Sequence, residues 1–432
     1  MSYPESLEFL YNLQWHGIRP GLERLETMMA RLDAPHRRFS SVLIAGTNGK
    51  GSTAAMIARA LREEGYRTGL YTSPHLIDFR ERIRIDGAMI PEEDLSALTG
   101  EIRTAVMPPG SGFLCTFFEF TTALAFLYFA RRRVDIAVIE VGLGGRFDAT
   151  NVLVPLASVI TPVDFDHETY LGETIEKITG EKAGIIKPNV PVIVGKQRPE
   201  ALSVIVDEAG RRSAPLVQFG IDFDVEGESP SSFVYRGGET LRLSSPLRGR
   251  HQIENASLAA AALESFGRSG APVSAEAIVR GIRNVEWEGR LEIVQEEPLV
   301  LLDGAHNPAG ARALAEFLAT QKHERRSGRI ILIVGILKDK NIAGILRPLL
   351  TLADEVIFTR PDLPRAASPS ELAESAGSYP LAIFTLDGVP DALAFALSRL
   401  TPGDLLCITG SLYTVGEAKA YFSGAAISPL RG

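Results

Sequence analysis

The stretch VLIAGTNGKGS at residues 42–52 constrains the fold of this chain more than any other. Residues 42–45 form a short apolar run typical of a buried strand, and residues 53–64 carry small and apolar side chains at helical spacing. A strand, a glycine loop, a lysine, a hydroxyl residue and a helix, in this order, are the parts of a phosphate cradle. The cradle is predicted from one contiguous set of residues: Gly46, Thr47, Asn48, Gly49, Lys50, Gly51 and Ser52.

The spacing inside this stretch departs from the common pattern G-x-x-x-x-G-K-[ST]. Gly46 stands only three residues before Gly49, and Ser52 stands two residues after Lys50. A glycine turn with an unrelated lysine is therefore the alternative interpretation. The strand and the helix on either side favour the phosphate site, because they place backbone N–H groups and a helix N-terminus at the loop.

Apolar runs alternate with helical patterns along the rest of the chain, which predicts an α/β fold with a mostly parallel sheet. Further strands are expected at residues 68–72, 134–141, 157–161 and 191–194, helices at 1–40 in two pieces, 91–106, 117–132 and 175–186, and a small antiparallel region at 219–243. A second alternation follows residues 285–295, with strands at 299–302, 330–337, 355–359, 382–386 and 405–409. We therefore expect two domains, at residues 1–290 and 291–432, the second one smaller and doubly wound.

Composition limits the partners and the location that can be expected. The 432 residues carry a net charge of −8 and are 45% hydrophobic, which argues against nucleic acid as the main partner. Two distant cysteines and the absence of an apolar leader favour a cytoplasmic protein. The apolar run at residues 113–130 has the length of a membrane span, but it contains Glu119 and leads directly into a predicted strand. A buried crossover helix is expected there, with no membrane contact.

Polar side chains follow several predicted strands where those strands end. Parallel strands bring such residues to one edge of the sheet, where a metal ion and nucleotide phosphates could bind. The residues concerned are Ser73, His75, Glu140, Asp164, Asp166 and His167. Three of them have an alternative interpretation: Glu140 as a partner of Arg82 or Arg146, Ser73 as a helix cap, and His167 as an ordinary polar histidine. The arginines at 80, 82 and 84 could bind carboxylates or form a salt-bridged strand face, and Lys182, beside Glu181, has the pattern of a solvated surface residue.

A series of motifs in this chain resembles the folylpolyglutamate synthase family, often bifunctional with dihydrofolate synthase, within the Mur ligase superfamily. The matching stretches lie in family order over nearly the whole chain: residues 45–52, 71–76, 81–83, 118–119, 140–146, 148–151, 166–167, 181–185, 249–252, 255–256, 287–290, 303–308 and 410–413. The resemblance implies an ATP-binding N-terminal domain of the P-loop type, a Rossmann-like C-terminal domain, and an active site between them.

The resemblance also implies roles for individual residues. The expected catalytic residues are Lys50, Lys182, which is expected to be carbamylated, and His306. The nucleotide is expected to be bound by the loop together with Asn255, Arg290 and Asp303, and two Mg²⁺ ions are expected in a site surrounded by Ser52, Ser73, Glu140 and His167. The folate is expected to lie among Arg82, Phe118, Thr121, Thr122 and Asp148. For Lys182, the implied catalytic role replaces the interpretation as a solvated surface residue. Only the resemblance supports this replacement.

The implied reaction is ATP-dependent addition of L-glutamate to a folate, and also to dihydropteroate. Phosphoryl transfer from ATP turns an unreactive carboxylate into an acyl phosphate, which the amine of glutamate then attacks. We expect a monomer whose partners are these small molecules. The alternatives are a Mur-type cell-wall ligase, which carries an additional N-terminal domain that the forty residues before the loop are too few to form, a small-molecule kinase, and a non-catalytic nucleotide switch.

Overall fold

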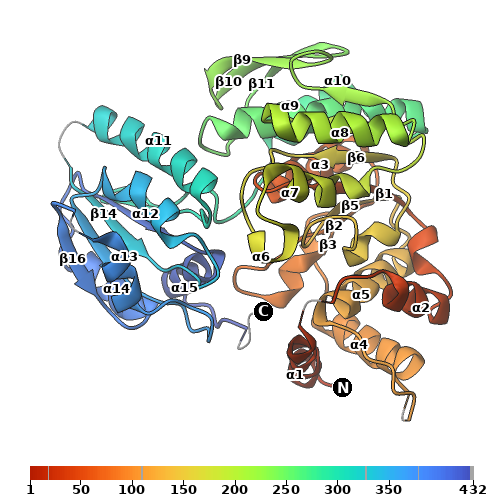
Figure 1. Ribbon diagram of the computed structural model, residues 1–432, viewed down its shortest axis with the longest axis horizontal. Coiled ribbons are helices and arrows are strands. Elements are labelled where there is room, and N and C mark those ends of the chain that lie inside the picture. Colours follow the sequence, from red (N-terminus) through yellow and green to blue (C-terminus); the bar gives the residue numbers. More distant parts are fainter. Residues whose placement is uncertain (18, 109, 326–327, 378, 429–432) are drawn as a thin grey trace.

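The computed structural model of the protein describes residues 1–17, 19–108, 110–325, 328–377 and 379–428. The chain forms two α/β units, each built on its own sheet, and the blue C-terminal unit lies beside the larger unit (Figure 1). This is the predicted class: a mostly parallel sheet domain that carries the glycine loop, followed by a smaller Rossmann-like sheet domain.

The larger sheet has eight strands: β1 (Ser40–Ala45), β2 (Thr68–Tyr71), β3 (Ile83–Ile85), β4 (Ala88–Met89), β5 (Ile136–Glu140), β6 (Ala157–Ile160), β7 (Val192–Val194) and β8 (Leu216–Gln218). Their order is β4-β3-β2-β5-β1-β6-β7-β8. All pairs are parallel except those of β3 and β4 at one edge. The chain leaves β1 for β2 on one side and later returns to β6 on the other. The glycine loop after β1 therefore lies at the switch point where such sheets bind ligands.

Helices bury both faces of this sheet. One face is covered by α1 (Tyr3–Asn12), α2 (Glu23–Arg31), α4 (Glu92–Val106), α5 (Phe117–Arg131), α7 (Ile175–Lys182) and α8 (Pro199–Arg211). The other face is covered by α3 (Lys50–Glu64), α9 (His251–Phe266) and α10 (Ala275–Arg283). The apolar run before residue 131 is the core helix α5, as predicted. Within the described ranges, no helix combines the length and the apolar character that crossing a bilayer requires.

Three antiparallel strands form a separate small sheet over the α9 side: β9 (Asp224–Ser229), β10 (Ser232–Arg236) and β11 (Thr240–Leu243). This confirms the antiparallel region predicted at residues 219–243. Figure 1 shows this ribbon at the top, away from the C-terminal unit.

The second sheet has six strands: β12 (Glu292–Gln295), β13 (Leu299–Leu302), β14 (Ile330–Val334), β15 (Glu355–Phe358), β16 (Ala382–Thr385) and β17 (Leu405–Thr409). Their order is β12-β13-β17-β14-β15-β16, and only β12 is antiparallel. One face is covered by α11 (Pro308–Arg325), α12 (Ile342–Leu350) and α13 (Pro369–Ala376). The other face is covered by α14 (Val389–Leu397) and α15 (Leu412–Ser423).

One contact between the units, here called the linker-side contact, consists of Leu76, Gly289, Val415 and Ser428. Leu76, from the loop after β2, is buried in the apolar cluster of the second sheet. A Cβ on Gly289 would lie 3.2 Å from Leu76 and 3.3 Å from Val415. Near the C-terminus, the backbone N–H of Ser428 donates to the carbonyl of Ile77 at 3.0 Å. The loop after β2 is therefore fastened to the second unit.

Some element boundaries differ from the predictions. Helix α3 begins at Lys50 rather than at residue 53, so the lysine belongs to the first turn. Helix α7 ends at Lys182, and a 3₁₀ turn at Ala183–Ile185 replaces its predicted continuation to residue 186. The arginine-rich segment begins as a 3₁₀ turn at Phe79–Arg82 and becomes a strand only at Ile83. Helices α8, α9 and α10 and strand β12 were not predicted.

Candidate active site

The glycine loop turns sharply between β1 and α3. Gly46 has φ +146° and Gly49 has φ +87°, backbone angles that residues with a Cβ rarely adopt. A Cβ on Gly46 would lie 1.8 Å from Thr161 Oγ1, and one on Gly49 would lie 2.3 Å from Asn255 Oδ1. The Lys50 ammonium folds back over the loop and donates to the carbonyls of Gly46 and Thr47 at 3.3 and 3.2 Å. Strand, loop and helix thus have the arrangement that a phosphate cradle requires.

Substituting Gly46 tests how closely this loop is packed. We expect Gly46→Ala to lower the free energy of unfolding by about 2–5 kcal/mol, since it adds a strained φ to an overlap with Thr161. The matched control is Gly100→Ala, inside α4, where an added Cβ meets no atom within 4 Å. The control is expected to be neutral or slightly stabilising. Urea unfolding of the two variants measures the difference, and equal midpoints would contradict the predicted packing.

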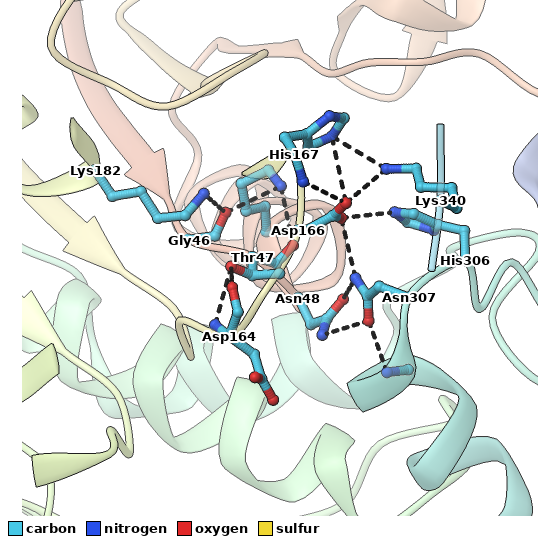
Figure 2. A network of polar contacts seen from close by, with 12 residues as sticks. Gly46, Thr47, Asn48, Asp164, Asp166, His167, Lys182, His306, Asn307 and Lys340 are labelled. Carbon is cyan, nitrogen blue, oxygen red and sulfur yellow. Dashed lines mark hydrogen bonds and ion pairs between the residues drawn. The ribbon is translucent and has the colours of Figure 1, made fainter. Parts of the chain in front are cut away.

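Lys182 is buried, not a solvated surface residue as its sequence pattern indicated: its exposed fraction is 5%. It ends α7 and donates through Nζ to the carbonyl of Gly46 at 2.9 Å, the same carbonyl that Lys50 contacts (Figure 2). Burial, with Lys50 as the next cause, lowers the pKa of Lys182 to about 7. Two lysines therefore converge on one backbone oxygen beside the loop.

Ser52, Ser73, Glu140 and His167 all line one cavity with the loop. Glu140 is buried at the end of β5, and its carboxylate accepts from the backbone N–H of Ser73 at 3.3 Å. Burial raises the pKa of Glu140, against Lys50, Arg290 and Arg82, which lower it. Ser52 Oγ accepts from Gln252 at 3.3 Å. Burial lowers the pKa of His167 to about 4, so its imidazole is neutral at pH 7, as metal binding requires.

Two of the alternative interpretations of this group do not match the described contacts. Ser73 precedes Pro74 in a loop and caps none of the described helices. Arg146 pairs with Glu181 at 3.5 Å, so it is not the partner that was suggested for Glu140.

Asp166 connects the two sheet domains. Its carboxylate lies 2.6 Å from Lys340 Nζ and 3.6 Å from His306 Nε2, and both of these groups belong to the second domain (Figure 2). Burial opposes ionisation, but His306, His167 and Lys340 hold the pKa of Asp166 well below its usual value. His306 Nδ1 donates to the carbonyl of Gly304 at 2.8 Å, and burial lowers the pKa of His306 to about 4. A neutral His306 thus faces the carboxylate.

Lys340 was missed by the sequence analysis. It follows β14, after Leu337, Lys338 and Asp339, and lines the cavity with an exposed side-chain fraction of 7%. The rule that identified Glu140, polar residues after the end of a parallel strand, applies equally to this segment and could have found it. His251 and Arg365 also line the cavity and were not singled out.

Arg290, Asp303 and Asn255 lie on the same cavity. Burial lowers the pKa of Arg290 and raises that of Asp303, and each of these groups opposes the shift of the other. Asp303 accepts from the backbone N–H groups of Leu291 and Ala305, both at 3.0 Å. Asn255 donates to Gln252 at 2.9 Å and approaches Gly49. These residues bring the second domain, α9 and the loop together.

The expected folate residues divide into two groups. Phe118, Arg82 and Asp148 line the cavity. Thr121 and Thr122 do not: they are fully buried behind its wall, where each hydroxyl lies 3.1 Å from Tyr71 Oη. The structure therefore does not bring these two threonines to the site, because they face the core side of α5.

Arg82 and Asp148 are each held by neighbouring groups. Arg82 is buried at the end of a 3₁₀ turn and not on a strand; it donates to His75 Nδ1 at 2.8 Å and its guanidinium lies 5.2 Å from the ring centre of Phe117. Asp148 accepts from the backbone of Gly142, Leu143 and Thr150 and from the Thr150 hydroxyl. Its carboxylate organises the loop after β5.

One cavity of about 940 Å³ is lined by the loop and by most of these groups, whereas Lys182, Asp166, Thr121 and Thr122 lie outside its lining. It runs from the glycine loop and α9 to the aromatic end at Phe117, Phe118 and Phe147, and the second domain closes one side through Asp303, His306 and Lys340. This volume is at the upper end for small-molecule sites, large enough for more than one ligand at a time.

Comparison with known proteins identifies the class and then the family. Residues 44–263 match the Mur ligase middle domain and residues 289–412 match the Mur ligase glutamate ligase domain, so the fold and the loop are those of a Mur ligase. The dihydrofolate synthase/folylpolyglutamate synthase of Bacillus subtilis (strain 168) is 38% identical over 428 residues, which cover 97% of this chain and 98% of that protein. The chain therefore belongs to the dihydrofolate synthase/folylpolyglutamate synthase family.

Solved structures agree over the full length. Escherichia coli FolC in complex with DHPP and ADP has a TM-score of 0.89 and 33% identity, covering 98% of both chains. The bifunctional folylpolyglutamate synthase/dihydrofolate synthase of Yersinia pestis c092, complexed with AMPPNP and Mn ion, has a TM-score of 0.87 and 32% identity over 98% of both chains. The first of these structures thus holds ADP, and the second holds AMPPNP together with a Mn ion.

Proposed function

We propose that this chain is an ATP-dependent ligase that joins L-glutamate to a folate through an acyl phosphate, and that it also accepts dihydropteroate. The observation that carries this proposal is the single cavity that joins the glycine loop to the Phe118 end. In this one cavity, a nucleotide at the loop can meet a carboxylate that enters from the aromatic end. Family membership supports the same reaction.

The nucleotide end is proposed to consist of the loop together with Asn255, Arg290 and Asp303. The N-terminus of α3 and Lys50 face the phosphates and stabilise the charge that develops during phosphoryl transfer. The domains proposed from the sequence, residues 1–290 and 291–432, place Arg290 at the boundary. Nucleotide binding there would draw the two domains together.

The residues around Glu140 fit a divalent cation. Carboxylate and hydroxyl oxygens are the donors that Mg²⁺ prefers, and Glu140, Ser52 and Ser73 supply them, with the neutral imidazole of His167 beside them. Within the described ranges, no three His, Cys, Asp or Glu side chains are arranged to hold a metal by themselves. We propose that phosphate oxygens complete the coordination and that bound Mg²⁺ neutralises phosphate charge.

Carbamylation of Lys182 is proposed for a second Mg²⁺. As an ammonium, Lys182 repels Lys50 across the Gly46 carbonyl. As a carbamate, it becomes an anion beside Lys50 and supplies two oxygen donors. The lowered pKa favours the neutral amine, which is the form that reacts with carbon dioxide.

The acceptor is proposed to lie between Phe118 and Arg82, where a ring can stack and a carboxylate can pair with a guanidinium. Glutamate is proposed to enter from the second domain, near Lys340 and His306. The neutral His306 can accept a proton from the attacking amine, and Asp166 holds His306 and Lys340 at the cavity wall. We further propose that the protein acts as a monomer in the cytoplasm.

Product analysis tests the proposal directly. The protein is incubated with ATP, Mg²⁺, glutamate and either dihydropteroate or tetrahydrofolate, and ADP and product mass are measured. One added glutamyl unit on both acceptors is the expected result; addition to tetrahydrofolate alone would limit the activity to polyglutamate synthesis. ADP release without amide on either acceptor would contradict the proposal and indicate a kinase or a ligase for another acid.

A further inference from the structure

The phosphate loop is joined to the second domain by a pair of side-chain amides. Asn307 Nδ2 donates to Asn48 Oδ1 at 2.9 Å, and Asn48 Nδ2 donates to Asn307 Oδ1 at 3.2 Å. The same Asn307 Nδ2 donates to Asp166 Oδ2 at 3.1 Å (Figure 2). Asn48 and Asp166 belong to the larger sheet domain, and Asn307 immediately precedes α11 of the second. These three side chains are here called the amide bridge.

Asn307 uses its full hydrogen-bonding capacity in this position. Besides Asn48, its Oδ1 accepts from the backbone N–H of Gly310 at 2.8 Å, in the first turn of α11. Both N–H groups and the carbonyl oxygen are engaged, and the side chain is 2% exposed. The carboxylate of Asp166 accepts a hydrogen bond and the N–H of Gly310 donates one, and the terminal amide of Asn307 satisfies both at once.

The amide bridge is continuous with groups that face the cavity. His306 and Asp303 lie on the same short loop as Asn307, and Asn48 lies in the phosphate loop. The position of Asn307 against Asn48 therefore sets how closely His306 and Asp303 approach the phosphate loop. Asp166 strengthens the contact because a hydrogen bond to a charged acceptor is stronger than one between neutral groups.

We propose that the amide bridge holds the second domain closed over the phosphate loop while the acyl phosphate exists, and that Asn307 is a positioning residue for amide formation. This inference rests on the proposed function. In the closed state the amine nitrogen of glutamate bonds to the acyl carbon, the carbon–oxygen bond to phosphate breaks, and an amide, inorganic phosphate and one proton result. In an open state water attacks instead: its oxygen bonds to the acyl carbon, the carbon–oxygen bond to phosphate breaks, and carboxylate and inorganic phosphate leave. The ADP that formed together with the acyl phosphate is then released without an amide product.

Asn307→Asp tests the bridge with little risk to the fold. Aspartate keeps the acceptor for Gly310 and is a good helix N-cap, but it loses both donors and faces the carboxylate of Asp166. The equilibrium constant for domain closure is expected to fall by about tenfold or more. This is the effect of losing at least two hydrogen bonds, one of them to a charged group. The number of ADP molecules released per amide bond formed is expected to rise clearly above the wild-type ratio. The affinity for ADP is expected to fall by a smaller factor than the closing equilibrium constant does.

Two further variants separate the bridge from general damage. Asn307→Ser keeps a cap without adding a charge and is expected to raise the ADP-to-amide ratio in the same direction by a smaller factor. Arg312→Ala removes another contact between the domains, the 2.9 Å ion pair with Asp164, in which Arg312 is 52% exposed. Such exposed pairs contribute little, so its ratio is expected to stay within about twofold of wild type.

Small-angle X-ray scattering with ADP supplies a readout that does not depend on the reaction. Wild type and Arg312→Ala are expected to be compact, and Asn307→Asp to have a larger radius of gyration. Two results would overturn the proposed role of the amide bridge. One is an equal radius of gyration for wild type and Asn307→Asp, and the other is an ADP-to-amide ratio that rises as much in Arg312→Ala as in Asn307→Asp. If the wild-type protein forms no amide from any folate, the proposed function fails. The scattering comparison alone then tests whether the amide bridge holds the domains closed.

Discussion

Lys50→Met is expected to lower kcat by about a thousandfold or more, because it removes the charge that faces the transferring phosphoryl group in a confined cavity. Methionine keeps the length and apolar stem of the side chain. Lys50 starts α3 and its ammonium donates to backbone carbonyls of its own loop, so the fold is expected to survive the change. Steady-state release of ADP, with glutamate and tetrahydrofolate saturating, measures the loss.

Lys187→Met is the matched control for Lys50. Lys187 also donates to a backbone carbonyl, that of Asn151 at 2.7 Å, but it does not line the cavity. Its kcat is expected to stay within about twofold of wild type, since changes away from a site mostly affect stability. Similar losses in both variants would show that Lys50 acts through folding rather than through phosphoryl transfer.

Lys182→Ala is expected to lower kcat by about a hundredfold or more, since it removes the proposed carbamate beside the phosphates. Carbamylation needs the unprotonated amine, and the pKa of Lys182 is about 7. The modified fraction is therefore expected to rise as pH increases through about 7 and to be lost below it. Enzyme supplied with ¹³C-bicarbonate should show a carbamate carbon signal that follows this pH dependence.

Two comparisons decide between a carbamate and a cation at this position. Lys182→Arg keeps the charge but cannot form the carbamate, so it is expected to be as inactive as Lys182→Ala. Added formate or acetate is expected to restore part of the activity of Lys182→Ala by supplying a carboxylate in the vacated space. Full activity of Lys182→Arg, or of wild type freed of bicarbonate, would show that Lys182 works as a cation.

The parts of the site that were predictable from the sequence are local. The loop from Gly46 to Ser52 lies between a strand and a helix that both have strong patterns, so its geometry follows from neighbours in the chain. Glu140 was found because it ends an apolar run and polar residues after parallel strands share one edge. Lys340 obeys the same rule, but its strand lies in the other sheet, and only the packing of the two domains brings it to Asp166.

Burial was the property that the sequence predicted least well. Lys182 follows a glutamate in a helix and has the pattern of a surface residue, yet packing against the glycine loop buries it. Thr121 and Thr122 lie on an apolar helix whose every face is covered, so no periodicity shows which side meets the cavity. The engagement of Asn307 with both Asn48 and Asp166 depends on three segments far apart in the chain.

The linker-side contact restricts the geometry of any opening. Leu76, Gly289, Val415 and Ser428 fasten the loop after β2, the interdomain linker and the last described residues to one another. A straight separation of the domains would pull Leu76 out of an apolar cluster, whereas a rotation about this point would keep it buried. We therefore expect the second domain to open by rotation about the linker-side contact, which keeps Leu76 buried, and not by straight separation.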